Sequence, residues 1–496
     1  MTDYSNPARV RVAPSPTGHM HLATARTALY DYLLAKKTGG QFVLRVEDTD
    51  IRRTVPGSEQ EIMDGLRWLG LAYDEGPDIG GPYGPYRQTE RRDAYVEHAL
   101  MLVESGHAYP CFCTPDRLEK VREEQQRRKV PMHYDGLCRR LDRDEAARRI
   151  ANGERHVIRF KMPQEGTTTA HDLLRGDIVV ENRNIDDYVL LKSDGLPTYH
   201  LAAMVDDHLM HITHVLRGAE WLSTFPLHVN VVRAFGWEEP VWVHLSLFLK
   251  PSGKGKLSKR DASEAIKDGY SVLVKDMHEL GFIPEGVLNW IALMGWGVAE
   301  DDVLGMQDMI ARFDLDHLTA SPAAINFAKL DHFNAAHIRL LSEADLATRI
   351  RPYFVRSDLP VQDDMLRKIA PLLKPRLTTL DDAVSMAGFF FRENVRANQE
   401  ELVPKGLTPA QALDATRQSL TVIQEADPFT VENVEPKMRE LVERLGLSAG
   451  QVFGILRAAV TGQKVSPPLF ESMEIIGKDK VLGRVRAAVD ELERMA

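Results

Sequence analysis

Two segments far apart in the chain carry side chains suited to handling phosphate. The first, residues 13–24, reads A-P-S-P-T-G-H-M-H-L-A-T and places His19 and His21 where an apolar helical pattern begins. The free N–H groups and the positive end of a helix N-terminus attract anions. Taken alone, the two histidines could equally cap the helix or pack. A His-x-His metal pair is the weakest interpretation, because no further ligands lie nearby in sequence.

The second segment, residues 253–260, reads G-K-G-K-L-S-K-R. Its glycines allow the backbone to move, and its three lysines and one arginine offer cations for a triphosphate. By itself such a segment is more often an ordinary lysine-rich surface loop.

A strand, a helix and a second strand position the first segment. Residues 10–12 are short and β-branched, residues 21–37 repeat apolar side chains at helical spacing, and residues 42–46 form another apolar strand. This βαβ unit predicts an open parallel sheet, whose ligands lie at the carboxyl ends of the strands. We therefore expect residues 14–21 and 47–50 at the site. The loop has neither the G-x-G-x-x-G nor the G-x-x-x-x-G-K-[ST] pattern.

The rest of the chain divides by composition. A charged helical stretch at 116–129 and a mixed segment at 154–187 predict an insertion between two halves of the sheet domain. The strand pattern returns at 211–216, and beyond about residue 336 the pattern is almost wholly helical.

Composition limits the class of protein. The 496 residues are 44% hydrophobic and 27% charged, with a net charge of -10, which argues against nonspecific coating of nucleic acid. Three cysteines are too few for a disulfide framework and suit a reducing compartment. No apolar run is long enough to span a membrane, and residues 1–11 carry no leader pattern. We expect a cytoplasmic protein.

Together, the two phosphate-handling segments resemble the paired signatures of class I aminoacyl-tRNA synthetases. They appear here as His21-Leu22-Ala23-Thr24 and Lys256-Leu257-Ser258-Lys259-Arg260. Longer stretches look like bacterial glutamyl-tRNA synthetases, the glutamate–tRNA ligases, and they extend over essentially the whole chain. These stretches are residues 11–18, 42–50, 74–77, 84–88, 191–201, 205–210 and 456–462.

The resemblance implies an α/β Rossmann-type catalytic domain with an inserted acceptor-binding domain, followed by all-α stem-contact and anticodon-binding domains. The boundaries we expect are 1–111 and 201–245 for the two catalytic halves, 112–200 for the insertion, 246–335 for stem contact, and 336–388 and 389–496 for two anticodon-binding helical subdomains.

It also implies the substrates L-glutamate, ATP with Mg²⁺, and tRNA(Glu), acted on by a monomer. The residues it assigns to glutamate binding are Arg11, Ser15, Glu47, Tyr199 and Arg217. Those it assigns to ATP are His19, His21, Thr24, Glu220, Lys256, Ser258 and Lys259, of which His21, Lys256 and Lys259 are also assigned to catalysis. An ion pair that supports the strand is the alternative role for Arg11.

Ala23 departs from the family, which commonly has glycine where the adenosine approaches the backbone. A methyl group at this position predicts weaker ATP binding rather than loss of activity.

The cysteines are close in sequence, and some relatives bind zinc in this region. Cys111, Cys113 and Cys138 supply three thiols, and Tyr134 matches a tyrosine ligand of a shortened relative. Arg140 stands where other relatives have histidine and cannot bind metal. The alternatives are a closed Zn²⁺ site and three unmetalled thiols.

Lys374-Pro375-Arg376 matches a site where arginine favours cytosine-ended glutamate anticodons over those of glutamine. The alternative role for this arginine is a bond to phosphate, which positions the tRNA without specifying its sequence. We expect a discriminating enzyme. The alternatives are an enzyme that also charges tRNA(Gln), and a tRNA-binding paralogue with weakened chemistry.

Overall fold

The computed structural model describes residue 4 and residues 6–258, 261, 265–297 and 302–496. The chain forms two compact units, one of residues 1–277 with 288–327, and one of residues 278–287 with 328–496. Among the described residues, no helix combines the length and apolar character needed to cross a bilayer.

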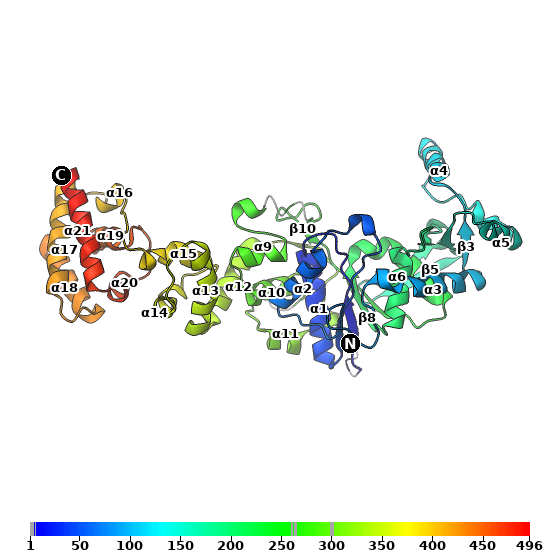
Figure 1. The fold of residues 1–496 in the computed structure, drawn as a ribbon, viewed down its shortest axis with the longest axis horizontal. Helices are drawn as coiled ribbons and strands as arrows, with labels where there is room; N and C mark the ends of the chain where they lie inside the picture. The colour runs from blue at the N-terminus through cyan, green and yellow to red at the C-terminus, as the bar shows by residue number, and fades with distance from the viewer. Residues whose placement is uncertain (1–3, 5, 259–260, 262–264, 298–301) are drawn as a thin grey trace. The chain divides into compact units, whose positions relative to one another are not determined.

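The predicted βαβ unit is confirmed at the start of the first unit. β1 (Arg9–Val12) pairs in parallel with β2 (Gln41–Leu44), and α1 (Leu22–Thr38) connects them (Figure 1). Gly39 ends α1 in the left-handed conformation that glycine adopts without strain. β8 (His214–Gly218) pairs in parallel with β9 (Val241–Leu245), and Thr213 and Arg9 exchange hydrogen bonds, so β8 lies beside β1.

The predicted insertion contributes its own strands to the first unit. β3 (Ala108–Cys111), β4 (Val157–Phe160) and β7 (Val189–Leu191) form one antiparallel sheet. β5 (Thr167–Asp172) and β6 (Gly176–Glu181) form a hairpin. The turn of this hairpin is hydrogen-bonded to β9, because Leu173 N donates to Trp242 O at 2.9 Å. β3 precedes residue 112, where the sequence places the start of the insertion, yet it pairs with the insertion's β4.

The first unit also contains helices and short 3-10 turns. Besides α1, the described helices that lie wholly within the first unit are α2 (Ser58–Trp68), α3 (Arg92–Glu104), α4 (Pro115–Arg127), α5 (Arg143–Ala151), α6 (Tyr199–Leu209), α7 (Phe225–Ala234) and α11 (Met306–Arg312). The short 3-10 turns are 51–53, 88–91, 138–140, 182–184, 219–224, 266–268 and 315–317. β10 (Phe248–Leu249) and β11 (Ala323–Ala324) pair in parallel, while α9 (Val274–Glu279), α10 (Pro284–Leu293) and α12 (Phe327–Leu340) cross the division.

Every residue of the second unit is described, and none lies in a strand, which confirms the predicted helical C-terminal region. Two apolar cores hold it together, one around α13 (Glu343–Arg356) and α14 (Asp363–Leu373) and one around α17 (Pro409–Glu425), α19 (Ala449–Thr461) and α21 (Lys478–Met495). The helices after α12 are α13 (Glu343–Arg356), α14 (Asp363–Leu373), α15 (Asp382–Ala387), α16 (Gln399–Leu402), α17 (Pro409–Glu425), α18 (Val431–Leu445), α19 (Ala449–Thr461), α20 (Leu469–Ile476) and α21 (Lys478–Met495), with a 3-10 turn at 388–391.

Candidate active site

Two cavities lie side by side at the carboxyl ends of the parallel strands. The smaller has a volume of about 270 Å³ and the larger about 1130 Å³. They share wall residues, among them Ser15 after β1, Glu47 after β2 and Tyr199 at the start of α6. This is the sheet edge at which the sequence places the ligand.

The smaller cavity contains all five residues assigned to glutamate. Its lining includes Arg11, Ser15, Glu47, Tyr199 and Arg217. Three of them, Arg11, Glu47 and Arg217, are at most 9% exposed. Arg11 and Arg217 lie on β1 and β8 and Tyr199 begins α6, whereas Ser15 and Glu47 lie in the loops that follow β1 and β2.

A buried charge network supports the first two of these residues. Arg11 Nε donates to Asp207 Oδ1 at 2.9 Å, and Arg45 Nη1 donates to the same oxygen at 2.7 Å. Arg45 Nη2 donates to Glu47 Oε1 at 3.1 Å. Burial raises the pKa of Glu47, although Arg45 and Arg11 partly offset the effect. Arg11 thus makes the strand-supporting ion pair while it lines the cavity.

Arg217 has a different environment. Its Nη1 donates to Tyr199 Oη at 3.4 Å, and the Tyr199 ring stacks on Trp221 with centroids 3.8 Å apart. Its guanidinium carbon lies 4.9 Å from the centroid of the Trp242 ring. Aromatic contacts of this kind help to fix the orientation of a guanidinium group, but they carry no negative charge to balance it.

The N-terminus of α1 faces the smaller cavity. His21 is its N-cap, and His21 Nδ1 accepts a hydrogen bond from Ala23 N at 3.1 Å. His21, Ala23 and Thr24 all line this cavity. His19 lies apart from them, because its Nδ1 pairs with Glu61 Oε1 of α2 at 2.6 Å, and it lines the larger cavity.

The basic loop reaches the smaller cavity through Lys256. A bridge between Leu249 and Lys256 extends β10, and Lys256 Nζ lies 3.5 Å from Glu220 Oε1. Both side chains line the cavity and are about half exposed. Ser258 does not line it and instead donates to Asp261 Oδ2 at 2.8 Å. Lys259 lies outside the described residues.

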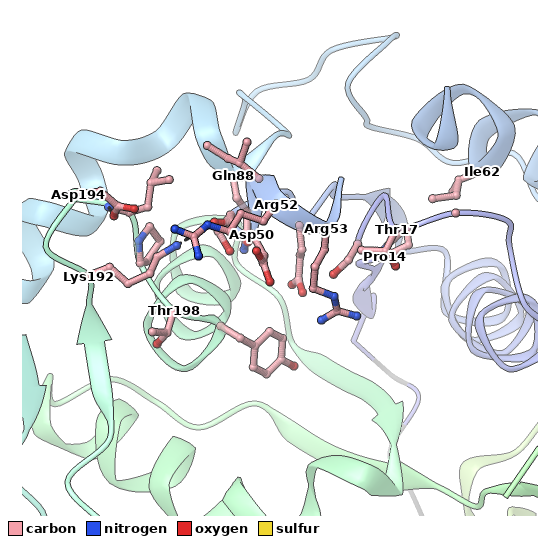
Figure 2. A pocket seen from close by; sticks show the side chains of 18 of the residues that line it. Pro14, Thr17, Asp50, Arg52, Arg53, Ile62, Gln88, Lys192, Asp194 and Thr198 are labelled. Carbon is pink, nitrogen blue, oxygen red and sulfur yellow. Dashed lines mark hydrogen bonds between the residues drawn. The ribbon is translucent and has the colours of Figure 1, made fainter. Parts of the chain in front are cut away.

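Both basic and acidic side chains line the larger cavity. Figure 2 shows Arg52, Arg53 and Lys192 around it, together with Asp50 and Asp194, and Arg155 completes its basic lining. Lys192 and Arg155 come from the insertion, whereas Arg52 and Arg53 follow the second strand of the βαβ unit.

The three cysteines converge in the insertion. Their sulfur atoms all lie within 4.8 Å of one another, and Cys113 Sγ is 3.6 Å from Cys138 Sγ. The Tyr134 hydroxyl lies 3.4 Å from the sulfur atoms of both Cys111 and Cys113. Three thiols and one phenol within this space fit a four-ligand structural metal site. Arg140 is exposed.

Arg376 follows α14 in the second unit and is exposed. Burial, together with the nearby charge of Arg376, lowers the pKa of Arg457 on α19. The structure therefore brings a second arginine, which lies in one of the family-like stretches, close to Arg376.

Several site residues had no role assigned from the sequence. Asp207 and Arg45 lie within family-like stretches, but only the fold shows that they support Arg11 and Glu47. Trp221, His228 and His244 lie near Arg217 and had no distinguishing local motif.

The parallel sheet, the helix N-terminus and the lysine loop together define the catalytic domain of a class I tRNA synthetase. The model of the family "tRNA synthetases class I (E and Q), catalytic domain" matches residues 7–332, and the "Anticodon binding domain" model matches residues 345–489.

Individual relatives narrow the class. A glutamate–tRNA ligase of Dehalococcoides mccartyi is 40% identical over 497 residues, covering 99% of each chain, and one of Roseiflexus sp. is 42% identical over 500 residues, covering 98% of this chain and 97% of that one. The crystal structure of a glutamate tRNA ligase from Elizabethkingia meningosepticum in complex with its amino acid matches with a TM-score of 0.89 and 37% identity, covering 98% of this chain and 100% of that one. The chain belongs to the family of glutamate–tRNA ligases, which use ATP to attach glutamate to tRNA.

Proposed function

We propose that this chain activates L-glutamate as its adenylate in the smaller cavity and then transfers it to the 3′ end of tRNA(Glu). One observation carries the proposal: the buried Arg11 and Arg217, the buried carboxyl group of Glu47, the N-terminus of α1 and Lys256 all line this cavity. An amino acid with two carboxylates and one ammonium needs such a set of charges.

The glutamate roles follow from the contacts of each side chain. We assign the substrate side-chain carboxylate to Arg217, whose fork can make two parallel hydrogen bonds. Arg11 contributes the second guanidinium, and Glu47 meets the ammonium group. Ser15 and Tyr199 complete the pocket. Glutamine in the same place would leave the Arg217 charge without an anion.

The chemistry requires no protein nucleophile. The glutamate α-carboxylate attacks the α-phosphorus of ATP and pyrophosphate leaves, after which a terminal ribose hydroxyl of tRNA attacks the adenylate carbonyl and releases AMP. Catalysis then consists of positioning and of stabilising the charge that develops on phosphate. We assign this to His21, the α1 N-terminus, Lys256 and Lys259, with Thr24 and Glu220 at the nucleotide. Mg²⁺, when bound, neutralises phosphate oxygens.

His19 and Ser258, which the sequence also assigns to ATP, have other partners in the structure. His19 is held by Glu61 beside the other cavity, and Ser258 is engaged by Asp261. Each would have to exchange its present partner for a phosphate group.

We assign the larger cavity to the end of the tRNA. It adjoins the pocket of the adenylate, as the second step requires, and its basic lining suits phosphodiester groups. Lys192 and Arg155 come from the insertion, which is the segment assigned to the acceptor stem.

We also propose that Cys111, Cys113, Cys138 and Tyr134 hold a structural Zn²⁺. The convergence of three sulfur atoms and one phenol supports this assignment. Metal analysis of the purified protein is expected to give one zinc per chain, reduced in a Cys138→Ser variant. Absence of zinc from protein prepared without chelators would leave three unmetalled thiols.

One charging experiment tests the main assignment. Labelled glutamate is supplied with ATP and either purified tRNA(Glu) or tRNA(Gln), and we expect charging of the first only. Equal charging of both would favour the non-discriminating alternative, and failure of pyrophosphate exchange with tRNA present would favour a weakened paralogue.

We further propose that the protein is a cytoplasmic monomer and that its domains divide at the boundaries expected from the sequence.

A further inference from the structure

Two imidazoles hold the guanidinium of Arg217. Arg217 Nε donates to His244 Nε2 at 3.0 Å, and Arg217 Nη2 lies 3.1 Å from His228 Nδ1. Arginine has only donors, so each ring nitrogen that faces it must be an acceptor. Both histidines are therefore neutral in this arrangement, and each carries its proton on the other nitrogen.

The remaining ring nitrogens have acceptors that match these tautomers. His244 Nδ1 lies 2.8 Å from Asp172 Oδ2, which also accepts from the His244 backbone N–H at 2.9 Å. His228 Nε2 lies 2.9 Å from His200 Nδ1. A continuous set of hydrogen bonds thus runs from Asp172 through His244, Arg217 and His228 to His200.

Burial keeps these imidazoles uncharged. His228, His244 and Asp172 are all 0% exposed. Burial lowers the pKa of His244 to about 4, although the bond to Asp172 opposes the shift, and burial with the charge of Arg217 lowers the pKa of His200 to about 4. The pKa of His228 is also lowered, first by burial and then by Arg217.

This arrangement distinguishes Arg217 from Arg11, which lines the same pocket. In the described part of the chain, its side-chain acceptors are His244, His228 and Tyr199, all of them neutral groups. Arg11, in contrast, is paired with the carboxylate of Asp207. Arg217 is therefore oriented by its partners but not neutralised by them.

We propose that Asp172, His244 and His228 are positioning residues that orient Arg217 while leaving its charge for the substrate, and that they thereby set the preference for glutamate over glutamine. The inference rests on the role proposed for Arg217. It also gives the insertion a part in amino-acid selection, because Asp172 ends β5 of the inserted hairpin.

The decisive comparison is a matched pair at His228. In His228→Asn the amide oxygen takes the place of Nδ1 and remains a neutral acceptor. His228→Asp has nearly the same shape but adds a negative charge beside Arg217. We expect the Asn variant to keep the KM for glutamate within about threefold. The Asp variant should raise it by about tenfold or more and reduce the preference for glutamate over glutamine, as expected for one charge-assisted hydrogen-bond partner.

A second pair of variants at His244 separates the effect of losing the hydrogen-bond acceptor from the effect of altered packing. In His244→Gln the side-chain oxygen can replace Nε2 as the acceptor, whereas His244→Leu removes it. We expect the Leu variant to raise the KM for glutamate by about tenfold or more and the Gln variant to recover most of that loss. The KM for ATP should stay the same in both. His171→Gln, a neighbouring exposed position whose ring pairs with Asp177 instead, is the matched control.

All variants are measured in the full-length protein by ATP–pyrophosphate exchange with tRNA present, with glutamate or glutamine as substrate. Thermal melting identifies any variant that fails to fold. Equal KM values for glutamate in His228→Asn and His228→Asp would overturn the inference. Arg217→Ala keeps the two proposals apart: if it leaves the KM for glutamate unchanged, the role of Arg217 itself is wrong, whereas a large effect there beside unaffected histidine variants rejects only the positioning role.

Discussion

At the residue scale, Arg11 and Arg217 line the same cavity but have opposite environments. Arg11 shares Asp207 with Arg45, so much of its charge is already balanced inside the protein. Arg217 is held by neutral acceptors. An incoming carboxylate should interact more strongly with Arg217 than with Arg11. The cost of removing the carboxylate from water is offset mainly by a cation whose charge is not already balanced by another anion.

Lys256 is the described lysine of the basic loop that reaches the cavity. We expect Lys256→Ala to slow adenylate formation by about 100-fold, the typical loss when one stabilising group of a developing charge is removed. Lys254→Ala, an exposed lysine two residues away that does not line the cavity, is the control. Single-turnover formation of the adenylate is the measurement, and equal rates in the two variants would remove Lys256 from the mechanism.

Ala23 places a methyl group on the wall of the same cavity. We expect Ala23→Gly to lower the KM for ATP by roughly two- to fivefold, because a crowding contact typically costs about 1 kcal/mol. The KM for glutamate should not change. An unchanged KM for ATP would mean that the nucleotide does not approach this methyl group.

At the element scale, α1 combines an N-terminus that lines the cavity with a buried carboxyl group in the middle of the helix. Its N-terminal turn lines the smaller cavity, whereas Asp31 in the middle of the helix is 0% exposed. Neither carboxyl oxygen of Asp31 has a hydrogen-bond partner among the residues that the structure describes. Burial raises the pKa of Asp31 well above its usual value, with Arg11 opposing the shift.

The raised pKa of Asp31 makes the folded state less stable as the pH rises. A carboxyl group whose pKa is higher in the folded state than in the unfolded state stabilises the fold at low pH and loses that contribution as the pH rises above about 4. We therefore expect Asp31→Asn to increase thermal stability at pH 7, by about 2–4 °C for each kcal/mol gained. The gain should vanish near pH 4. Melting curves of both proteins between pH 4 and 7 provide the measurement, and a gain that does not depend on pH would contradict it.

At the scale of the whole molecule, amino-acid chemistry and anticodon recognition are assigned to different compact units. The first carries both cavities, and the second carries Arg376 with Arg457 nearby. Each unit has its own apolar core, as expected for domains that could fold separately.

Arg376 is the residue we assign to anticodon choice. We expect Arg376→Gln to narrow the preference for tRNA(Glu) over tRNA(Gln) by about tenfold, since one good base contact contributes about 1–3 kcal/mol of discrimination. Arg367→Gln, an exposed arginine on α14, is the control. Charging of both purified tRNAs is compared. If both variants weaken the two tRNAs equally, Arg376 binds phosphate and does not specify sequence.

The sequence by itself was sufficient to predict the family, the βαβ unit and the helical C-terminal region. Local periodicity and long motifs carry that information. The apolar spacing of residues 21–37 and the lysine loop can be recognised from a short stretch of sequence, without knowledge of tertiary contacts. The structure also places Arg11, Glu47 and Arg217 around one cavity, as their assigned roles require.

Only the tertiary structure decided which partners these side chains have. Asp172 and His244 are far apart in the chain, and a hairpin of the insertion must lie against β9 before they can meet. The burial of Asp31 and the neutrality of the histidines around Arg217 likewise depend on what surrounds them on all sides. Such effects arise from desolvation and from contacts distant in sequence, which no local pattern of residues encodes.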